Sequence, residues 1–369
     1  MKILYLTTHL NIGGIASYCL SLAKGLKAKG HSVYLATSSG ELIPELVKTG
    51  ASFFPIPIRT KSEINIFKIY PSLWRLLPYI KEKEIEVVHS NTRVTQVLGN
   101  LIHKNARLAH VYTCHGFFRR NLSRKIFPGW PNKVIAISEP VRENLINDFK
   151  LEEDKIVLIH NGIDLDKYGA GIKPEDKQIA RARLSLDSGP IVGIIARLSD
   201  VKGHAYLIQA MPKILKVMPG VRLLIVGDGR LKSELEVLSN SLGLSKEVIF
   251  LPKVADTRQI LQALDVFVMP SLKEGLGLGL MEAMALGVPV IGSNVGGIKS
   301  LLKAGKNGLL VEPGNSLAIA EAVLELLRDR EKAIRLADNA RDFIINNFSL
   351  EEMVTKTERV YRECLSVNS

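Results

Sequence analysis

Residues 264–292, LDVFVMPSLKEGLGLGLMEAMALGVPVIG, form the segment around which the rest of the chain is organised. The apolar run Val266–Met269 predicts a short strand, which Pro270 ends. A glycine-rich turn follows, and then a helix-forming run over residues 281–286. Val288–Ile291 starts the next strand. Strand, turn, helix and strand in this order are typical of a parallel α/β sheet.

Two carboxylates flank the glycine-rich turn of this segment. Glu274 stands at its head and Glu282 lies within the predicted helix. Glycines at 275, 277 and 279 expose backbone N–H groups close to the N-terminus of the helix, and such a loop suits an anion. The segment therefore predicts an anion site with an acid on either side.

The same alternation of strands and helices extends along the whole chain. A length of 369 residues is more than one hydrophobic core usually serves, so we expect two domains, with the junction within 166–189. The predicted strands cover 2–8, 31–37, 52–56, 86–89, 107–114, 133–137, 155–159, 191–196, 221–226 and 247–250. The predicted helices cover 15–29, 65–83, 92–104, 139–149 and 203–217, and residues 316–367 are expected to be helical. This alternation favours doubly wound parallel sheets.

Three further groups follow predicted strands, at the edge where α/β proteins bind ligands. Arg197 and Lys202 precede a helix and together suit a diphosphate, although two solvated surface charges are the alternative. Gly13 and Gly14 follow the first strand and either admit a phosphate or form a plain tight turn. His115 is either a ligand-facing side chain or a structural one.

The net charge bears on the binding partners of the protein, and the cysteine content bears on its cellular compartment. The net charge is +12, and residues 1–172 carry 23 basic and 14 acidic residues. This excess is compatible with nucleic acid, an anionic membrane surface or an anionic substrate. Residues 117–133 combine five basic side chains with aromatic ones, which suits a membrane interface, single-stranded nucleic acid or a solvated loop. Three widely spaced cysteines form neither a disulfide framework nor a metal site, which favours a reducing cytoplasm.

Several motifs in the expected order resemble the GT-B glycosyltransferases of family 4. The spacing of Glu274 and Glu282 within PSLKEGLGLGLMEAMALGVPVIGS is the most specific of them. The weaker matches are Gly13-Gly14, His115-Gly116, HNGID at 160–164, ARLSDVKG at 196–203, VGDG at 226–229 and LLVEPGN near 311–314. The resemblance covers nearly the whole chain.

This resemblance implies two Rossmann-like domains facing a central cleft. Residues 1–170 would bind the acceptor, residues 171–347 would bind the nucleotide-sugar, and a helix over 348–369 would cross back to the first domain. It also implies a role for each site residue. Arg197 and Lys202 would hold the diphosphate, Glu282 the ribose, and Glu274 the donor sugar beside His115. Donor contacts are further implied for Gly13, Gly14, Gly275, Leu276, Gly277 and Leu278, with no metal ligand.

The resemblance implies a retaining, metal-independent enzyme that needs no cofactor and uses a nucleotide-sugar such as a UDP-hexose. From the basic first half we expect a lipid-linked or saccharide acceptor of cell-envelope polysaccharide synthesis. We also expect a cytoplasmic location, peripheral on the inner face of the cytoplasmic membrane. Two alternatives stay open: a nucleotide-sugar 2-epimerase, which would need no acceptor, and a basic nucleic-acid-binding protein. We rank the nucleic-acid-binding hypothesis last because no recognised nucleic-acid module is present.

Overall fold

The structure, a computed structural model, describes residues 1–60, 66–118, 129–186 and 189–368. Contacts between Cα atoms divide the chain into two compact units. Unit 1 comprises Met1–Gly162 with Leu350–Ser369, and unit 2 comprises Ile163–Ser349. The first unit therefore ends at residue 162, where the sequence predicted residue 170.

Unit 1 contains one parallel sheet in the order β3-β2-β1-β4-β5-β6-β7. Its strands are β1 Lys2–Leu6, β2 Ser32–Thr37, β3 Ser52–Pro55, β4 Val87–Ser90, β5 Ala109–Cys114, β6 Lys133–Ala136 and β7 Ile156–Leu158. Its helices are α1 Gly14–Ala28, α2 Ile43–Lys48, α3 Ile66–Lys83, α4 Arg93–Ala106, α6 Glu139–Phe149 and α16 Leu350–Asn368. The strand order reverses between β1 and β4, as in a doubly wound sheet.

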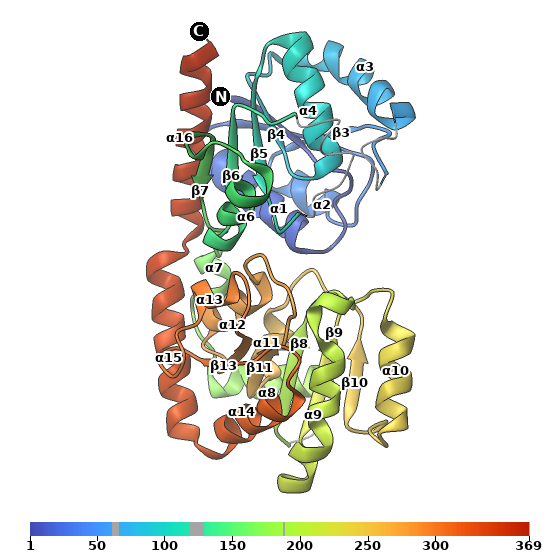
Figure 1. The fold of residues 1–369 in the computed structure, drawn as a ribbon, viewed down its shortest axis with the longest axis vertical. Coiled ribbons are helices and arrows are strands. Elements are labelled where there is room, and N and C mark those ends of the chain that lie inside the picture. Colours follow the sequence, from blue (N-terminus) through green and yellow to red (C-terminus); the bar gives the residue numbers. More distant parts are fainter. Residues whose placement is uncertain (61–65, 119–128, 187–188, 369) are drawn as a thin grey trace. The chain divides into compact units, whose positions relative to one another are not determined.

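Helices cover both faces of this sheet, because successive side chains of a buried strand point to opposite sides. Ile3 and Tyr5 of β1 belong to a core shared with α1 and α16. Leu4 and Leu6 belong to a second core shared with α3 and α4. Figure 1 accordingly places α16 and α3 on opposite sides of unit 1.

Unit 2 repeats the architecture with a sheet in the order β10-β9-β8-β11-β12-β13. Its strands are β8 Ile191–Ile195, β9 Arg222–Val226, β10 Val248–Leu251, β11 Val266–Met269, β12 Val290–Ser293 and β13 Leu309–Val311. Its helices are α7 Leu165–Tyr168, α8 Pro174–Arg183, α9 His204–Val217, α10 Lys232–Ser241, α11 Arg258–Ala263, α12 Leu278–Leu286, α13 Ile298–Leu301, α14 Ser316–Arg328 and α15 Arg330–Asn347. All pairings are parallel, and the order reverses between β8 and β11.

The predicted fold class, two Rossmann-like α/β sheets, is confirmed. The structure contains helices that were not predicted, among them α2, α8, α10, α11 and α13. They were missed because they are short and weakly periodic in sequence. The predicted junction region 166–189 includes most of α7 and all of α8, which belong to unit 2. The helix predicted over 281–286 begins three residues earlier, at Leu278.

The C-terminal helix α16 returns to unit 1, as the resemblance implied. It packs on α1 and β5, and its Tyr361 is fully buried. The Tyr361 hydroxyl lies 2.6 Å from Nδ1 of His89 in β4. Nε2 of the same histidine lies 2.7 Å from the Thr113 hydroxyl in β5. This network attaches the last helix to the sheet by polar contacts as well as by apolar packing.

Most of the basic and aromatic segment 117–133 lies outside the described residues, which resume at Gly129. Four of its five basic side chains fall in the gap at 119–128. Lys133 is described, and its ammonium donates to the carbonyl of Asp154 at 2.5 Å. The membrane or nucleic-acid interpretation of this segment stays a prediction.

Candidate active site

The predicted anion-binding residues of unit 2 gather where its strand order reverses. Arg197 and Lys202 follow the carboxyl end of β8, and Glu274 follows the carboxyl end of β11. Because β8 and β11 are neighbours in the sheet, their following loops lie side by side. The reversal point is the place where open α/β sheets bind ligands.

Lys202 and Glu274 form an ion pair at this edge. The Glu274 side chain is only 10% exposed, and that of Lys202 is 20% exposed. The carboxylate of Glu274 also accepts hydrogen bonds from the Ser271 hydroxyl at 3.4 Å and from the Gly275 backbone N–H at 3.1 Å. A largely buried carboxylate is thus held by one cation and two neutral donors.

Close backbone contact between the two loops fixes this pair in place. The N–H of Leu272 donates to the carbonyl of Val201 at 2.8 Å. Gly203 has φ +71° and lies against Pro270, where a Cβ atom would come within 1.9 Å of the Pro270 carbonyl oxygen. Only glycine fits this position, so Lys202-Gly203 is a structural requirement of the site as well as a chemical one.

The glycine-rich turn leads into α12 as the sequence predicted. Gly277, at φ +100°, is the residue that precedes the helix, and the carbonyl of Glu274 accepts from the N–H of Gly297 at 3.0 Å. The side chain of Leu276 is buried, so only its backbone can serve a ligand. The N–H groups of Leu278 and Gly279 open the helix and have no partner within it, as at any helix start.

Arg197 is exposed, in contrast to Lys202. Its guanidinium has no hydrogen bond or ion pair with any residue that the structure describes. Its loop is held in place by the N–H of Leu198, which donates to the carbonyl of Asp228 at 3.0 Å. Arg197, Lys202 and Glu274 together carry a net charge of +1, so this edge of the sheet attracts an anion.

His204, which sequence reasoning did not select, begins α9 directly after this loop. Its side chain is buried, and burial together with the charge of Lys202 lowers its pKa to about 4. A neutral imidazole therefore stands beside Lys202 at physiological pH.

Glu282 belongs to a different cluster, formed with residues that sequence reasoning missed. Its carboxylate accepts from the Thr257 hydroxyl at 2.8 Å, and the Tyr168 hydroxyl lies 2.9 Å from that of Thr257. Burial raises the pKa of Glu282, and the hydrogen bond from Thr257 opposes this. No sequence signal connects Tyr168, Thr257 and Glu282, because their meeting depends on how α7, α11 and α12 pack.

The remaining candidate residues belong to unit 1. Gly13 and Gly14 stand at the N-terminus of α1, and His115 follows β5. Nε2 of His115 lies 3.2 Å from Oδ1 of Asn91, and its ring packs edge-on against Tyr18 at 4.7 Å between centroids. Burial lowers the pKa of His115 to about 3, so the ring is neutral at physiological pH.

The amide of Asn91 determines which tautomer His115 adopts. Its Nδ2 donates to the carbonyl of His89 at 3.3 Å, which leaves Oδ1 as the acceptor facing His115. Nε2 of His115 must then carry the proton, and Nδ1 keeps a lone pair. His115 is therefore suited to accept a hydrogen bond from a ligand hydroxyl through Nδ1.

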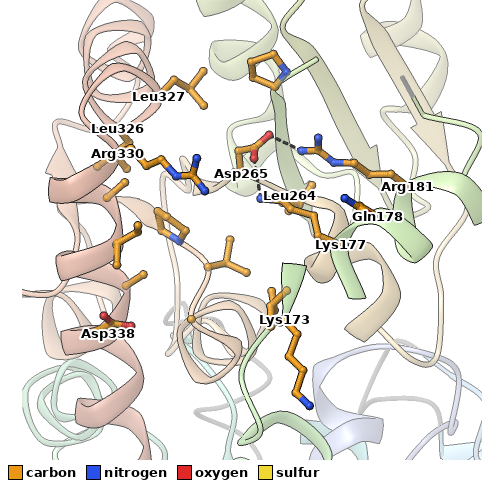
Figure 2. Close-up of a pocket in the computed structure, with 18 of the residues that line it drawn as sticks. Lys173, Lys177, Gln178, Arg181, Leu264, Asp265, Leu326, Leu327, Arg330 and Asp338 are labelled. Atoms are coloured by element: carbon orange, nitrogen blue, oxygen red, sulfur yellow. Dashed lines mark hydrogen bonds and ion pairs between the residues drawn. The ribbon is translucent and has the colours of Figure 1, made fainter. Parts of the chain in front are cut away.

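A cavity of about 680 Å³ lies at the opposite, amino-terminal edge of the second sheet (Figure 2). Leu264, Asp265 and Pro289 line it where β11 and β12 begin, and Lys177 and Arg181 of α8 bind the Asp265 carboxylate there. The Asp265 carboxylate also accepts from the N–H of Ile191 at 2.7 Å. These contacts join α8 to the sheet, and none of the predicted site residues lines the cavity.

No group of three or more His, Cys, Asp or Glu side chains within the described ranges is arranged to hold a metal ion. Asp164 and Asp166, which have the Asp-x-Asp form, lie at the start of the short helix α7. Their position is that of residues that favour a helix start.

Comparisons with known proteins identify the family. Residues 176–343 match the model for glycosyl transferases group 1, and residues 12–167 match the model for Glycosyltransferase Family 4. A UDP-Gal:alpha-D-GlcNAc-diphosphoundecaprenol alpha-1,3-galactosyltransferase of Escherichia coli is 30% identical over 89% of this chain and 87% of its own. An uncharacterized glycosyltransferase of Methanocaldococcus jannaschii is 29% identical over 95% of this chain and 94% of its own.

A solved structure gives the same result for the fold. The crystal structure of a glycosyltransferase from Rickettsia africae superposes with a TM-score of 0.85, at 26% identity, over 99% of this chain and 98% of that one. The chain therefore belongs to glycosyltransferase family 4 and is a glycosyltransferase with the GT-B fold. These relatives do not favour the epimerase or the nucleic-acid-binding alternative.

Proposed function

We propose that this enzyme transfers a hexose, with retention of anomeric configuration and without a metal ion, from a UDP-sugar to a lipid-linked saccharide. The observation that carries the proposal is the set of two cations and one carboxylate at the point where the strand order of unit 2 reverses. The Escherichia coli relative, whose name specifies UDP-Gal and a diphosphoundecaprenol-linked sugar, supports this type of donor and acceptor.

The chemistry follows from the need to stabilise the leaving group. When the bond between the sugar and the diphosphate breaks, negative charge develops on the diphosphate oxygens. Arg197, Lys202 and the N–H groups at the start of α12 are donors that can meet this charge, a role that a metal ion fills in other enzymes. We propose that Glu274 accepts from a hydroxyl of the donor sugar and that Glu282 accepts from the ribose.

Unit 1 would supply contacts to the other parts of the reaction. We propose that Gly13 and Gly14 approach the phosphate with their backbone and that His115 accepts a hydroxyl of the donor sugar through Nδ1. The acceptor would bind to unit 1, on the cytoplasmic face of the membrane. Cys19, Cys114 and Cys364 are buried and form no disulfide, which is compatible with a reducing compartment.

The test is release of nucleoside diphosphate from a panel of nucleotide-sugars, with and without a polyprenyl-diphosphate-linked sugar and with and without EDTA. We expect acceptor-dependent release from a UDP-hexose that EDTA does not reduce, and an α-linked product by NMR when the donor is an α-linked UDP-hexose. Interconversion of free nucleotide-sugars without any acceptor would refute transfer, and loss of activity in EDTA would refute metal independence.

A further inference from the structure

Helix α3 (Ile66–Lys83) of unit 1 exposes a row of aromatic side chains. Phe67 is 83% exposed, Tyr70 47% and Trp74 67%. Residues three and four positions apart share one face of a helix, so these three rings form a single stripe. Scattered exposed apolar residues need no explanation, but a contiguous aromatic surface of this kind marks an interaction site.

The stripe is not a by-product of a loosely packed helix. The opposite face of α3 is fully engaged in the core of unit 1, through Ile69, Leu73, Leu76 and Ile80, which are all at most 4% exposed. Burial of that face already fixes the helix on the sheet. None of the three aromatic side chains belongs to this core, and leaving them in water has a cost that a partner would remove.

Basic side chains accompany the aromatic ones on α3. Lys68, Arg75 and Lys81 are exposed, and no ion pair with a described residue neutralises them. Lys83 pairs with Glu82 at 2.8 Å, and Glu82 is the only acid of the helix. The helix thus carries a net charge of +3 on its solvent side.

We infer that the exposed face of α3 (Phe67, Tyr70 and Trp74 with Lys68, Arg75 and Lys81) docks on an anionic lipid bilayer. Tryptophan and tyrosine prefer the membrane–water interface, where an apolar ring meets polar headgroups, and cations attract anionic lipids. A helix that lies in the interface needs this combination of one aromatic face with flanking basic residues. The inference deepens the proposed function, whose acceptor is lipid-linked, and names the surface that would bring the enzyme to it.

This surface differs from the segment 117–133 to which sequence reasoning assigned the membrane contact. Helix α3 is also too polar to cross a bilayer, since none of the helices that the structure describes is long and apolar enough to do so. Docking through α3 would therefore be peripheral and reversible. It should weaken as salt screens the charges of Lys68, Arg75 and Lys81.

The experiment is sedimentation of the full-length enzyme with vesicles of phosphatidylcholine containing about one third phosphatidylglycerol at low salt. A Trp130→Phe background leaves Trp74 as the only tryptophan, so its emission reports on the helix directly. We expect co-sedimentation, a blue shift of Trp74 emission, and release at high salt. In the native background, Phe67→Ser/Trp74→Ser should weaken vesicle binding by at least about tenfold.

A matched control removes exposed apolar side chains elsewhere. Val237 is 66% exposed and Leu317 60% exposed in unit 2, so Val237→Ser/Leu317→Ser should leave vesicle binding unchanged. Lys68→Gln/Arg75→Gln/Lys81→Gln should abolish the preference for anionic over neutral vesicles. Circular dichroism and thermal unfolding of each variant show that it folds.

Three outcomes would overturn the inference. The first is wild-type protein that stays in the supernatant at low salt, and the second is a Phe67→Ser/Trp74→Ser variant that binds as tightly as wild type. The third is concentration-dependent self-association that the same variant abolishes, which would assign the face to a second copy of the chain. Release of nucleoside diphosphate with a water-soluble acceptor analogue tests the proposed function separately, because it does not require vesicles.

Discussion

Lys202 forms an ion pair with Glu274, and this pair joins the loop that follows β8 to the loop that follows β11. The cation that should hold a diphosphate is therefore neutralised by the carboxylate proposed to hold the sugar. Donor binding has to redistribute these contacts, since the phosphate competes with Glu274 for Lys202. Arg197, which has no such partner among the described residues, is free to make the first contact.

This arrangement predicts opposite effects of Glu274→Gln on binding and on turnover. The amide keeps the shape of the side chain but releases the ammonium of Lys202, so UDP should bind about three- to tenfold more tightly. Turnover should fall by about a hundredfold or more, because a donor hydroxyl loses a charged acceptor. Calorimetric titration with UDP and steady-state rates measure the two effects. Weaker UDP binding by the variant would show that Glu274 does not compete for Lys202.

Arg197→Ala and Lys202→Ala should both reduce activity but differ in their effect on stability. Each removes one donor to the leaving group, and we expect a loss in kcat of about a hundredfold. Arg197 is exposed, so its removal should change stability by less than about 0.5 kcal/mol. Lys202→Ala leaves the largely buried carboxylate of Glu274 without its cation and should cost about 1–3 kcal/mol. Wild-type activity in both variants would exclude the proposed diphosphate roles.

Glu282→Ala should mainly weaken nucleotide binding, with a smaller effect on turnover. Its carboxylate is oriented by Thr257, so Thr257→Val should also raise the Kd for UDP, but by less than Glu282→Ala does. Thr257→Ser keeps the hydroxyl and serves as the matched control. Kd values for UDP and kcat for each variant give the comparison. If Glu282→Ala lowered kcat without changing the Kd, the roles assigned to the two glutamates would be exchanged.

Buried histidines should make unit 1 sensitive to acid. His110 is fully buried, and burial lowers its pKa to about 3. Its Nδ1 donates to Oδ1 of Asn100 at 2.8 Å, and its Nε2 lies 2.9 Å from the Ser90 hydroxyl. Between pH 6.5 and pH 3 the unfolded chain binds a proton that the folded chain does not, so the free energy of unfolding falls as the pH falls. At pH 5 the free energy of unfolding is lowered by about 2 kcal/mol for one such histidine.

Both tryptophans, Trp74 and Trp130, lie in unit 1, so tryptophan fluorescence during urea unfolding reports on this unit. His110→Gln removes the titrating group and should reduce the difference in stability between pH 7 and pH 5 by about 2 kcal/mol. His160→Gln, a substitution in the same unit, serves as the control. An unchanged pH dependence in His110→Gln would contradict a neutral, buried His110.

Much of the fold could be predicted because local sequence patterns determine it. Short apolar runs such as Val266–Met269 form strands, and glycines such as Gly203 and Gly277 occupy positions where the backbone has a positive φ. The predicted helices that were long and periodic, including α3 and α9, are present. Short helices such as α8 and α11 were not predicted, because two or three turns carry too little periodicity to be recognised.

The face of α3 illustrates what periodicity leaves undecided. Apolar side chains occur all round this helix, among them Phe67, Ile69, Leu73 and Trp74. From the sequence, either side could have faced the sheet. The packing of Ile69 and Leu73 into the core decides that Phe67 and Trp74 face solvent.

The sequence by itself determined the α/β class, the two-sheet organisation and the family, because these follow from the order of strands, turns and helices and from motifs within single loops. Only the tertiary structure decided which side chains meet. Lys202 and Glu274 are 72 positions apart, and Tyr168, Thr257 and Glu282 come from three different helices or their starts. Such contacts depend on which strands are neighbours and on how helices pack over them, and a linear pattern carries no record of either.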